Sequence, residues 1–176
     1  MTTKWKILTF FGIFIFATVL TLFIEPVKLS GLLEKLIFNA VSVLVGLSIA
    51  IIGIFLSSIN TIYLSIYKIL KTKDQQIFTK DEIKEIKEGL SDLVDELKEN
   101  AVFTLFAFII TLTLFFIKDL DLPYIKWFIE SSVVTKEFVM NLLILLGNFL
   151  IFWAIIDSTK VVFRITKAFE LMDNEE

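Results

Sequence analysis

Residues 36–67 read LIFNAVSVLVGLSIAIIGIFLSSINTIYLSIY, a run of thirty-two residues without a charged side chain. Small and amide residues recur along this run in steps of three or four. At about 100° per residue, they fall within an arc of roughly 80° on one face of a helix. The other faces of that helix are aliphatic and aromatic, which predicts a membrane span whose small, polar face meets protein or water. We call these positions the small-residue face: Asn39, Ser42, Gly46, Ala50, Gly53, Ser57 and Asn60.

The small-residue face has two interpretations. In the first, it packs against a neighbouring helix, because small residues let two backbones approach closely in lipid. In the second, it lines a pore or the axis of an oligomer. An uncharged face of this kind suits a weakly selective pore gated by apolar rings, provided that several copies assemble.

The composition of the whole chain predicts an integral membrane protein. Of its 176 residues, 56% are hydrophobic and nineteen are Phe, and the mean hydropathy is +0.81. A soluble domain of this size could not bury so much apolar surface. The chain has no Cys and no His, which excludes disulfides, haem, Cys/His zinc sites and catalysis by either side chain. We expect no cofactor, and the net charge of −3 gives no reason to expect a nucleic-acid partner.

Four uncharged runs are long enough to cross a hydrocarbon core of roughly 30 Å. Besides the run that begins at Leu36, they are residues 7–24, 101–117 and 138–156. The first is longer than the core of a signal peptide and no A-x-A-like site follows it, so we interpret it as a retained span. The predicted fold is an all-α integral membrane protein with four transmembrane helices and helical cytoplasmic extensions.

The loop between the first and second spans and the loop between the third and fourth spans also carry local structural signals. Residues 25–35 contain Pro26 and Gly31, which favour turns, so a short connection is expected there. Residues 118–137 hold aromatic side chains beside a lysine, which predicts a short helix lying in the headgroup layer.

Residues 71–100 form the only extensive polar segment. Thr79 and Glu82 make a capping box, which predicts the start of a helix. No Gly or Pro separates this helix from the third span, so residues 80–117 are expected to be one continuous helix. Apolar residues recur along the polar segment with coiled-coil spacing, and we call them the cytoplasmic seam: Ile83, Ile86, Leu90, Leu93 and Leu97. The seam either folds back on the second span or packs against other subunits or a soluble partner.

The fourth span carries Asn141 and Asn148, one heptad apart. An amide inside the membrane costs free energy unless it is paired, so both are expected to face other helices and to belong with the packing or pore-lining residues. After Asp157 an amphipathic pattern continues to about residue 172 and predicts a second helical extension.

These patterns divide the chain into four regions. Residues 1–70 hold the first two spans and the cytoplasmic extension of the second, and residues 71–100 form a cytoplasmic amphipathic helix. Residues 101–160 hold the third and fourth spans with an interfacial loop between them. Residues 161–176 form a cytoplasmic helix that ends in an acidic tail.

The distribution of Lys and Arg predicts the orientation. Twelve lie in the amino terminus, in residues 68–100 after the second span and in the carboxyl tail (two, seven and three), against five in the loops of residues 25–35 and 118–137 (two and three). Because cytoplasmic loops carry the excess of basic residues, both termini and the polar segment are expected in the cytoplasm of a multi-pass protein of the cell membrane. The composition is compatible with a bacterial inner membrane.

The sequence favours a structural function over a chemical one. No predicted span contains an ionisable residue, and the motifs of intramembrane hydrolysis, phosphate loops and potassium filters are absent. We therefore expect no enzymatic activity, and coupled transport is only a residual hypothesis. The first hypothesis is a homo-oligomeric, pore- or channel-like subunit regulated by its cytoplasmic helices. The alternative is a membrane anchor or scaffold that recruits a soluble effector, for example in a bacterial phage-defence system; that analogy rests on architecture alone.

Overall fold

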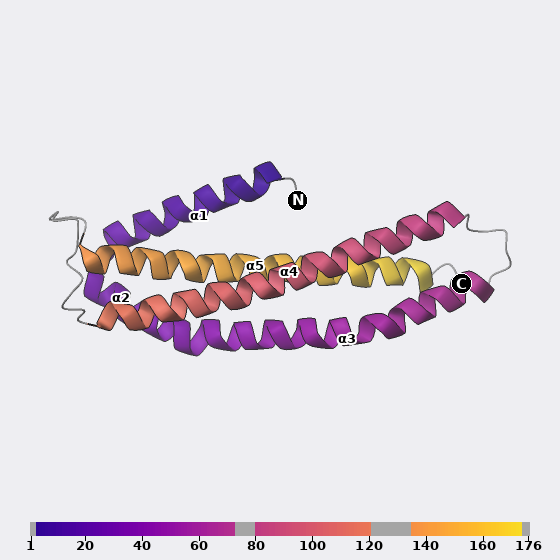
Figure 1. Cartoon of the computed structure of the whole chain (residues 1–176). Helices are drawn as coiled ribbons and strands as arrows, with labels where there is room; N and C mark the ends of the chain where they lie inside the picture. Colours follow the sequence, from indigo (N-terminus) through magenta and orange to yellow (C-terminus); the bar gives the residue numbers. More distant parts are fainter. Residues whose placement is uncertain (1–2, 73–79, 121–134, 174–176) are drawn as a thin grey trace. The chain divides into compact units, whose positions relative to one another are not determined.

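A computed structural model describes residues 3–72, 80–120 and 135–173 of the chain, and within these ranges every element is helical, which confirms the all-α prediction. Figure 1 shows them in order along the chain. The elements are α1 (Thr3–Phe23), α2 (Pro26–Lys35), η1 (Leu36–Val41), α3 (Ser42–Thr72), α4 (Lys80–Asp119) and α5 (Lys136–Asp173).

Three helical stretches among the described residues are long and apolar enough to cross a membrane. They are Pro26–Ser57, Ser91–Lys118 and Lys136–Lys167. α1 contributes a shorter apolar stretch, Ile7–Phe23. Length and composition thus place the chain among membrane proteins, with three helices of full spanning length.

Residues 26–35 form a helix, so the predicted short connection between the first two spans was wrong. Pro26 occupies the first turn of α2, where its fixed φ suits the helix and its missing N–H is not needed. Gly31 lies inside α2 and does not have a positive φ. α2 runs directly into η1, a π-helical stretch, because Leu36 keeps a right-handed helical conformation. The membrane-length helix that corresponds to the predicted second span therefore begins at Pro26, ten residues before the expected start.

The two long helices agree with the predictions made for them. α4 is continuous from Lys80 to Asp119, and α5 continues past Asp157 to Asp173. The capping box at Thr79 and most of the predicted interfacial helix fall outside the described residues.

The chain divides into two compact units. Unit 1 comprises Met1–Val45 and Thr104–Trp153. Its core is a cluster of aliphatic and aromatic side chains from α1, α2, η1, α4 and α5: Ala17, Leu29, Leu33, Ile37, Phe115, Ile144 and Leu145. The rings of Phe16 and Phe149 lie 5.5 Å apart, so α1 packs beside α5 in this unit (Figure 1).

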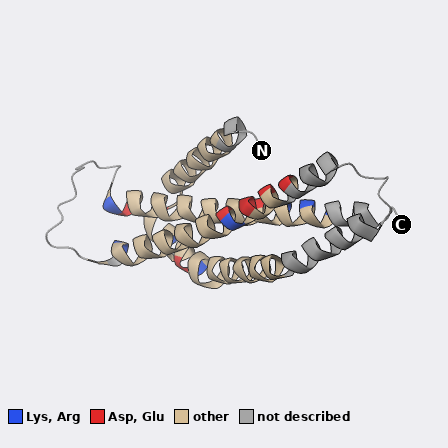
Figure 2. Ribbon diagram, turned by 45° about the vertical axis from the view of Figure 1, so that its right-hand side comes forward, with Lys and Arg blue, Asp and Glu red and all other residues tan. Residues whose placement is uncertain are grey.

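Unit 2 comprises Gly46–Phe103 and Ala154–Glu176. Its core joins one residue of α3 and one of α4 to two of α5: Ile52, Leu97, Val161 and Ile165. Figure 2 shows the contrast in charge. The described charges of unit 2 line α4 and α5, whereas the α4 and α5 segments of unit 1 are uncharged except at their ends.

Candidate functional site

The small-residue face of α3 and η1 is turned outward in both units. In unit 1, Asn39 is exposed and Ser42 is half-buried. In unit 2, the exposed members are Gly46, Ala50, Gly53 and Ser57, while the side chain of Asn60 lies outside the described ones. A Cβ added at Gly46 or Gly53 would meet no atom within 4 Å.

The buried residues of the same helices are branched aliphatic ones, although Val43, Leu44, Leu47, Ile51 and Ile54 are exposed. Ile37 and Val41 are 1% exposed and Val45 is 3% exposed in unit 1, and Ile52 is 4% exposed in unit 2. Within the described part of the chain, packing therefore uses these four residues, and the small-residue face, like the exposed aliphatic residues, is left for lipid, water or another molecule.

Hydroxyl groups on the small-residue face are satisfied locally. Ser57 Oγ donates to the Ile54 carbonyl at 2.7 Å, and Ser42 Oγ donates to the Ile37 carbonyl. Such bonds satisfy the hydroxyl donor within its own helix, so it needs no partner from another helix. The Asn39 side chain is exposed, although it lies near the middle of a membrane-length helix. Its amide needs a partner from water or from another chain.

Asn141 and Asn148 lie inside unit 1 and are fully buried. Asn141 Nδ2 donates to the Pro26 carbonyl at 3.3 Å, which ties α5 to the start of α2. Asn148 Nδ2 donates to the Ile144 carbonyl of its own helix at 2.9 Å. The Oδ1 atoms of both amides accept no hydrogen bond from the described residues. These amides therefore belong to the interior of unit 1, whereas Asn39 faces outward.

Unit 1 also contains a close helix crossing that the sequence analysis did not identify. Thr111 of α4 is 2% exposed, and its Oγ1 donates to the Ala107 carbonyl at 2.7 Å. A Cβ added at Gly147 of α5 would overlap with Thr111 Oγ1. The crossing depends on the missing side chain at Gly147. The seven-residue spacing of Thr104 and Thr111 marks the face of α4, but no sequence signal shows which residue of α5 faces it.

The described part of the cytoplasmic seam packs within unit 2. Leu97 is fully buried in the core with Val161 and Ile165, and Leu93 is partly buried against it. The side chains of Ile83, Ile86 and Leu90 lie outside the described ones.

Polar contacts flank this part of the seam. Asn100 Nδ2 donates to Asp157 Oδ2 at 3.4 Å, and Asp157 is only 5% exposed. Arg164 Nη1 lies 3.7 Å from Glu96 Oε2. Both contacts join α4 to α5. The two helices are antiparallel, because the earlier residue of α4 contacts the later residue of α5. Sequence reasoning treated Asp157 as a charge at the end of a span and missed its partner. The signal was available, because Asn100 follows Leu97 on the same helix face.

Among the described residues, no group of three or more Asp, Glu, His or Cys could hold a metal ion. Comparison of the chain with protein-family models, with curated proteins and with solved structures finds no match.

Proposed function

We propose that this chain is the subunit of a homo-oligomeric membrane protein with a pore or channel-like function. The observation that supports it is the outward small-residue face of α3. In lipid, exposing branched aliphatic side chains costs little free energy, whereas exposing an amide without a hydrogen-bond partner costs much more. A helix that packs through only part of its aliphatic surface and leaves small residues and an amide exposed is arranged to meet a second protein chain or a column of water.

The proposed oligomer places the small-residue faces of its copies around one axis. Gly46 and Gly53 would allow the helices to approach, and Asn39 would supply a ring of amides. The lipid bilayer and further copies of the chain are the partners of this assembly. The proposal includes no cofactor and no enzymatic activity.

Unit 2 supplies a route for regulation. Its core places Ile52 of α3 in one cluster with Leu97 of α4 and with Val161 of α5. A displacement of α4 against α5 would therefore be transmitted to the helix that carries the small-residue face. In the proposed topology α1 also crosses the membrane, which makes four spans in all, and the polar parts of α4 and α5 lie in the cytoplasm. A cytoplasmic signal would act on this cluster.

Single-cysteine variants test the proposal, because the chain has no native Cys to interfere. Gly46→Cys and Gly53→Cys lie on the proposed axis, and Leu47→Cys and Ile54→Cys are their neighbours on an exposed aliphatic face. In membranes, the two glycine positions should give dimers with a short bifunctional maleimide, and the two controls should not. The same glycine positions should react with a charged, water-soluble thiol reagent.

The outcomes separate the hypotheses. Crosslinking together with water access supports an oligomeric pore, and native mass measurement then gives the number of subunits. Crosslinking without water access supports a packed oligomer and contradicts the pore. If neither occurs and the purified protein is a monomer, the oligomer is excluded. The anchor hypothesis would then be tested through the cytoplasmic helices, although the described part of their seam already packs within unit 2.

A further inference from the structure

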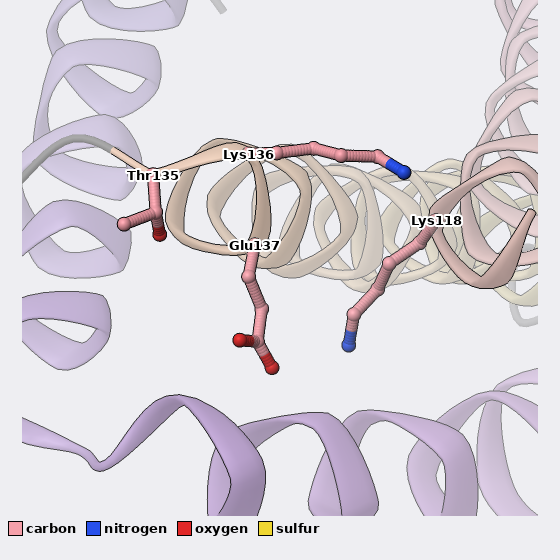
Figure 3. A pocket seen from close by; sticks show the side chains of 4 residues that line it. All are labelled: Lys118, Thr135, Lys136 and Glu137. Atoms are coloured by element: carbon pink, nitrogen blue, oxygen red, sulfur yellow. The ribbon is translucent and has the colours of Figure 1, made fainter. Parts of the chain in front are cut away.

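A pocket of about 440 Å³ opens in unit 1 where α4 ends and α5 begins. It is lined by Lys118, Thr135, Lys136 and Glu137. Figure 3 shows Lys118 and Glu137 pointing into the same space from the two helices, while Lys136 extends from the start of α5 towards α4. The pocket therefore brings two amines and one carboxylate together.

Hydrogen bonds hold the two lysines at this end of unit 1. Lys118 Nζ donates to Ser30 Oγ of α2. Lys136 Nζ donates to the Leu120 carbonyl at 3.1 Å. Lys118, Lys136 and Glu137 are all half-buried, so their charges are only partly screened by water.

The position of the pocket along the helices indicates its depth in a membrane. Lys118 ends one membrane-length apolar stretch, and Lys136 begins the next. Residues 104–117 and 138–153 are uncharged, as Figure 2 shows for α4 and α5 of unit 1. In the proposed topology, the pocket lies where the hydrocarbon core meets the headgroups, which is the level at which lipid phosphate groups are found.

We propose that this pocket binds the headgroup of a phospholipid that carries a primary amine. The lipid phosphate would lie against Lys118 and Lys136, because charge-assisted hydrogen bonds from two ammonium groups suit a phosphate diester. Its ammonium would lie against the carboxylate of Glu137. A choline headgroup has no N–H to donate to Glu137, and a glycerol headgroup has no positive charge. The site does not depend on the formation of a pore.

The test uses the full chain purified in detergent and three lipids of equal chain length. Binding is followed by native mass spectrometry and by the shift in Tm on addition of phosphatidylethanolamine, phosphatidylglycerol or phosphatidylcholine. The wild-type protein should bind phosphatidylethanolamine most tightly and phosphatidylcholine most weakly. Glu137→Gln should weaken phosphatidylethanolamine binding roughly 10- to 100-fold and leave phosphatidylglycerol binding unchanged or stronger.

Lys136→Gln should weaken both lipids by a similar factor, and Lys136→Arg should retain them. Lys160→Gln, an exposed lysine of α5 in unit 2, is the matched control and should bind like the wild type. Lys118 is left unchanged because it also bonds Ser30.

Three results would overturn the proposal. Equal binding of all three lipids by the wild type would mean that the lysines only reach the headgroup layer without selecting a headgroup. Retention of the preference in both Glu137→Gln and Lys136→Gln would place the lipid elsewhere. If inorganic phosphate produced the same shift in Tm as phosphatidylethanolamine, the site would be one for a free anion.

Discussion

At the scale of single residues, Gly147 has the clearest structural requirement. Gly147→Ala would place a methyl group on Thr111 Oγ1, and both residues lie on long helices that cannot easily move apart. We expect unit 1 to lose roughly 1–3 kcal/mol of unfolding free energy, the usual cost of overpacking. The measurement is denaturant unfolding of the detergent-purified protein, followed by the near-UV signal.

Two further variants identify the cause of that loss. Gly12→Ala, at a position where a Cβ would meet no atom within 4 Å, should be neutral or slightly stabilising. Thr111→Ala in the Gly147→Ala background should recover part of the stability, because the overlapping hydroxyl is removed. A Gly147→Ala protein as stable as the Gly12→Ala protein would show that the two helices do not cross at this point.

The amides show what the sequence can and cannot predict about single residues. The cost of an amide in lipid predicted that Asn141 and Asn148 face other helices, and both are buried in the structure. Their acceptors, the Pro26 and Ile144 carbonyls, were not predictable. Any helix carbonyl within reach can serve, because its oxygen has a second lone pair, and periodicity alone does not say which helix comes near. Asn39 has the same side chain but is exposed, since the residues that its helix buries at this level are Ile37 and Val41.

At the scale of helices, continuity was easier to predict than boundaries. The lengths of α4 and α5 followed from the lack of Pro and from only one Gly in each. Residues 25–35 were misjudged because Pro and Gly were both taken as turn formers. Pro is also favoured in the first turn of a helix, and Gly is tolerated inside one that packs well. Leu29 and Leu33 bury one face of α2 in unit 1, and this tertiary packing outweighs the local cost of Gly31.

The contact between Asn100 and Asp157 leads to a prediction about the pairing of α4 with α5. Asn100→Leu would leave the nearly buried Asp157 carboxylate without this donor. We expect a loss of about 1–3 kcal/mol of unfolding free energy, since an unsatisfied buried acceptor keeps its full desolvation cost. Limited proteolysis and thermal unfolding in detergent would measure it.

Lys98→Ala is the matched control for that variant. It removes an exposed ion pair with Asp95, two residues from Asn100, and should change stability by no more than about 0.5 kcal/mol. The double variant Asn100→Leu with Asp157→Leu should recover stability, because replacement of both partners by apolar groups removes the unsatisfied carboxylate. Equal stability of Asn100→Leu and Lys98→Ala would mean that the Asp157 carboxylate is served by water instead.

At the scale of the whole molecule, the membrane class was predicted from composition, because no soluble fold could bury this much apolar surface. The path through the membrane follows from a different property, the distribution of Lys and Arg between loops, which leaves no mark on helix packing. Orientation and the number of spans therefore stay predictions. They depend mainly on α1, whose apolar stretch is shorter than the three membrane-length stretches.

The decisive experiment on topology asks on which side of the membrane each end of the chain lies. If α1 crosses the bilayer, Thr2→Cys and Asn174→Cys should both resist a membrane-impermeant maleimide in intact cells and both react after permeabilisation. Ser132→Cys, between the last two spans, should react in intact cells and serves as the positive control. Labelling of Thr2→Cys but not Asn174→Cys in intact cells would mean three spans. α1 would then lie along the outer surface, its exposed phenylalanines (Phe10, Phe11, Phe14 and Phe16) resting in the interface instead of facing the lipid core.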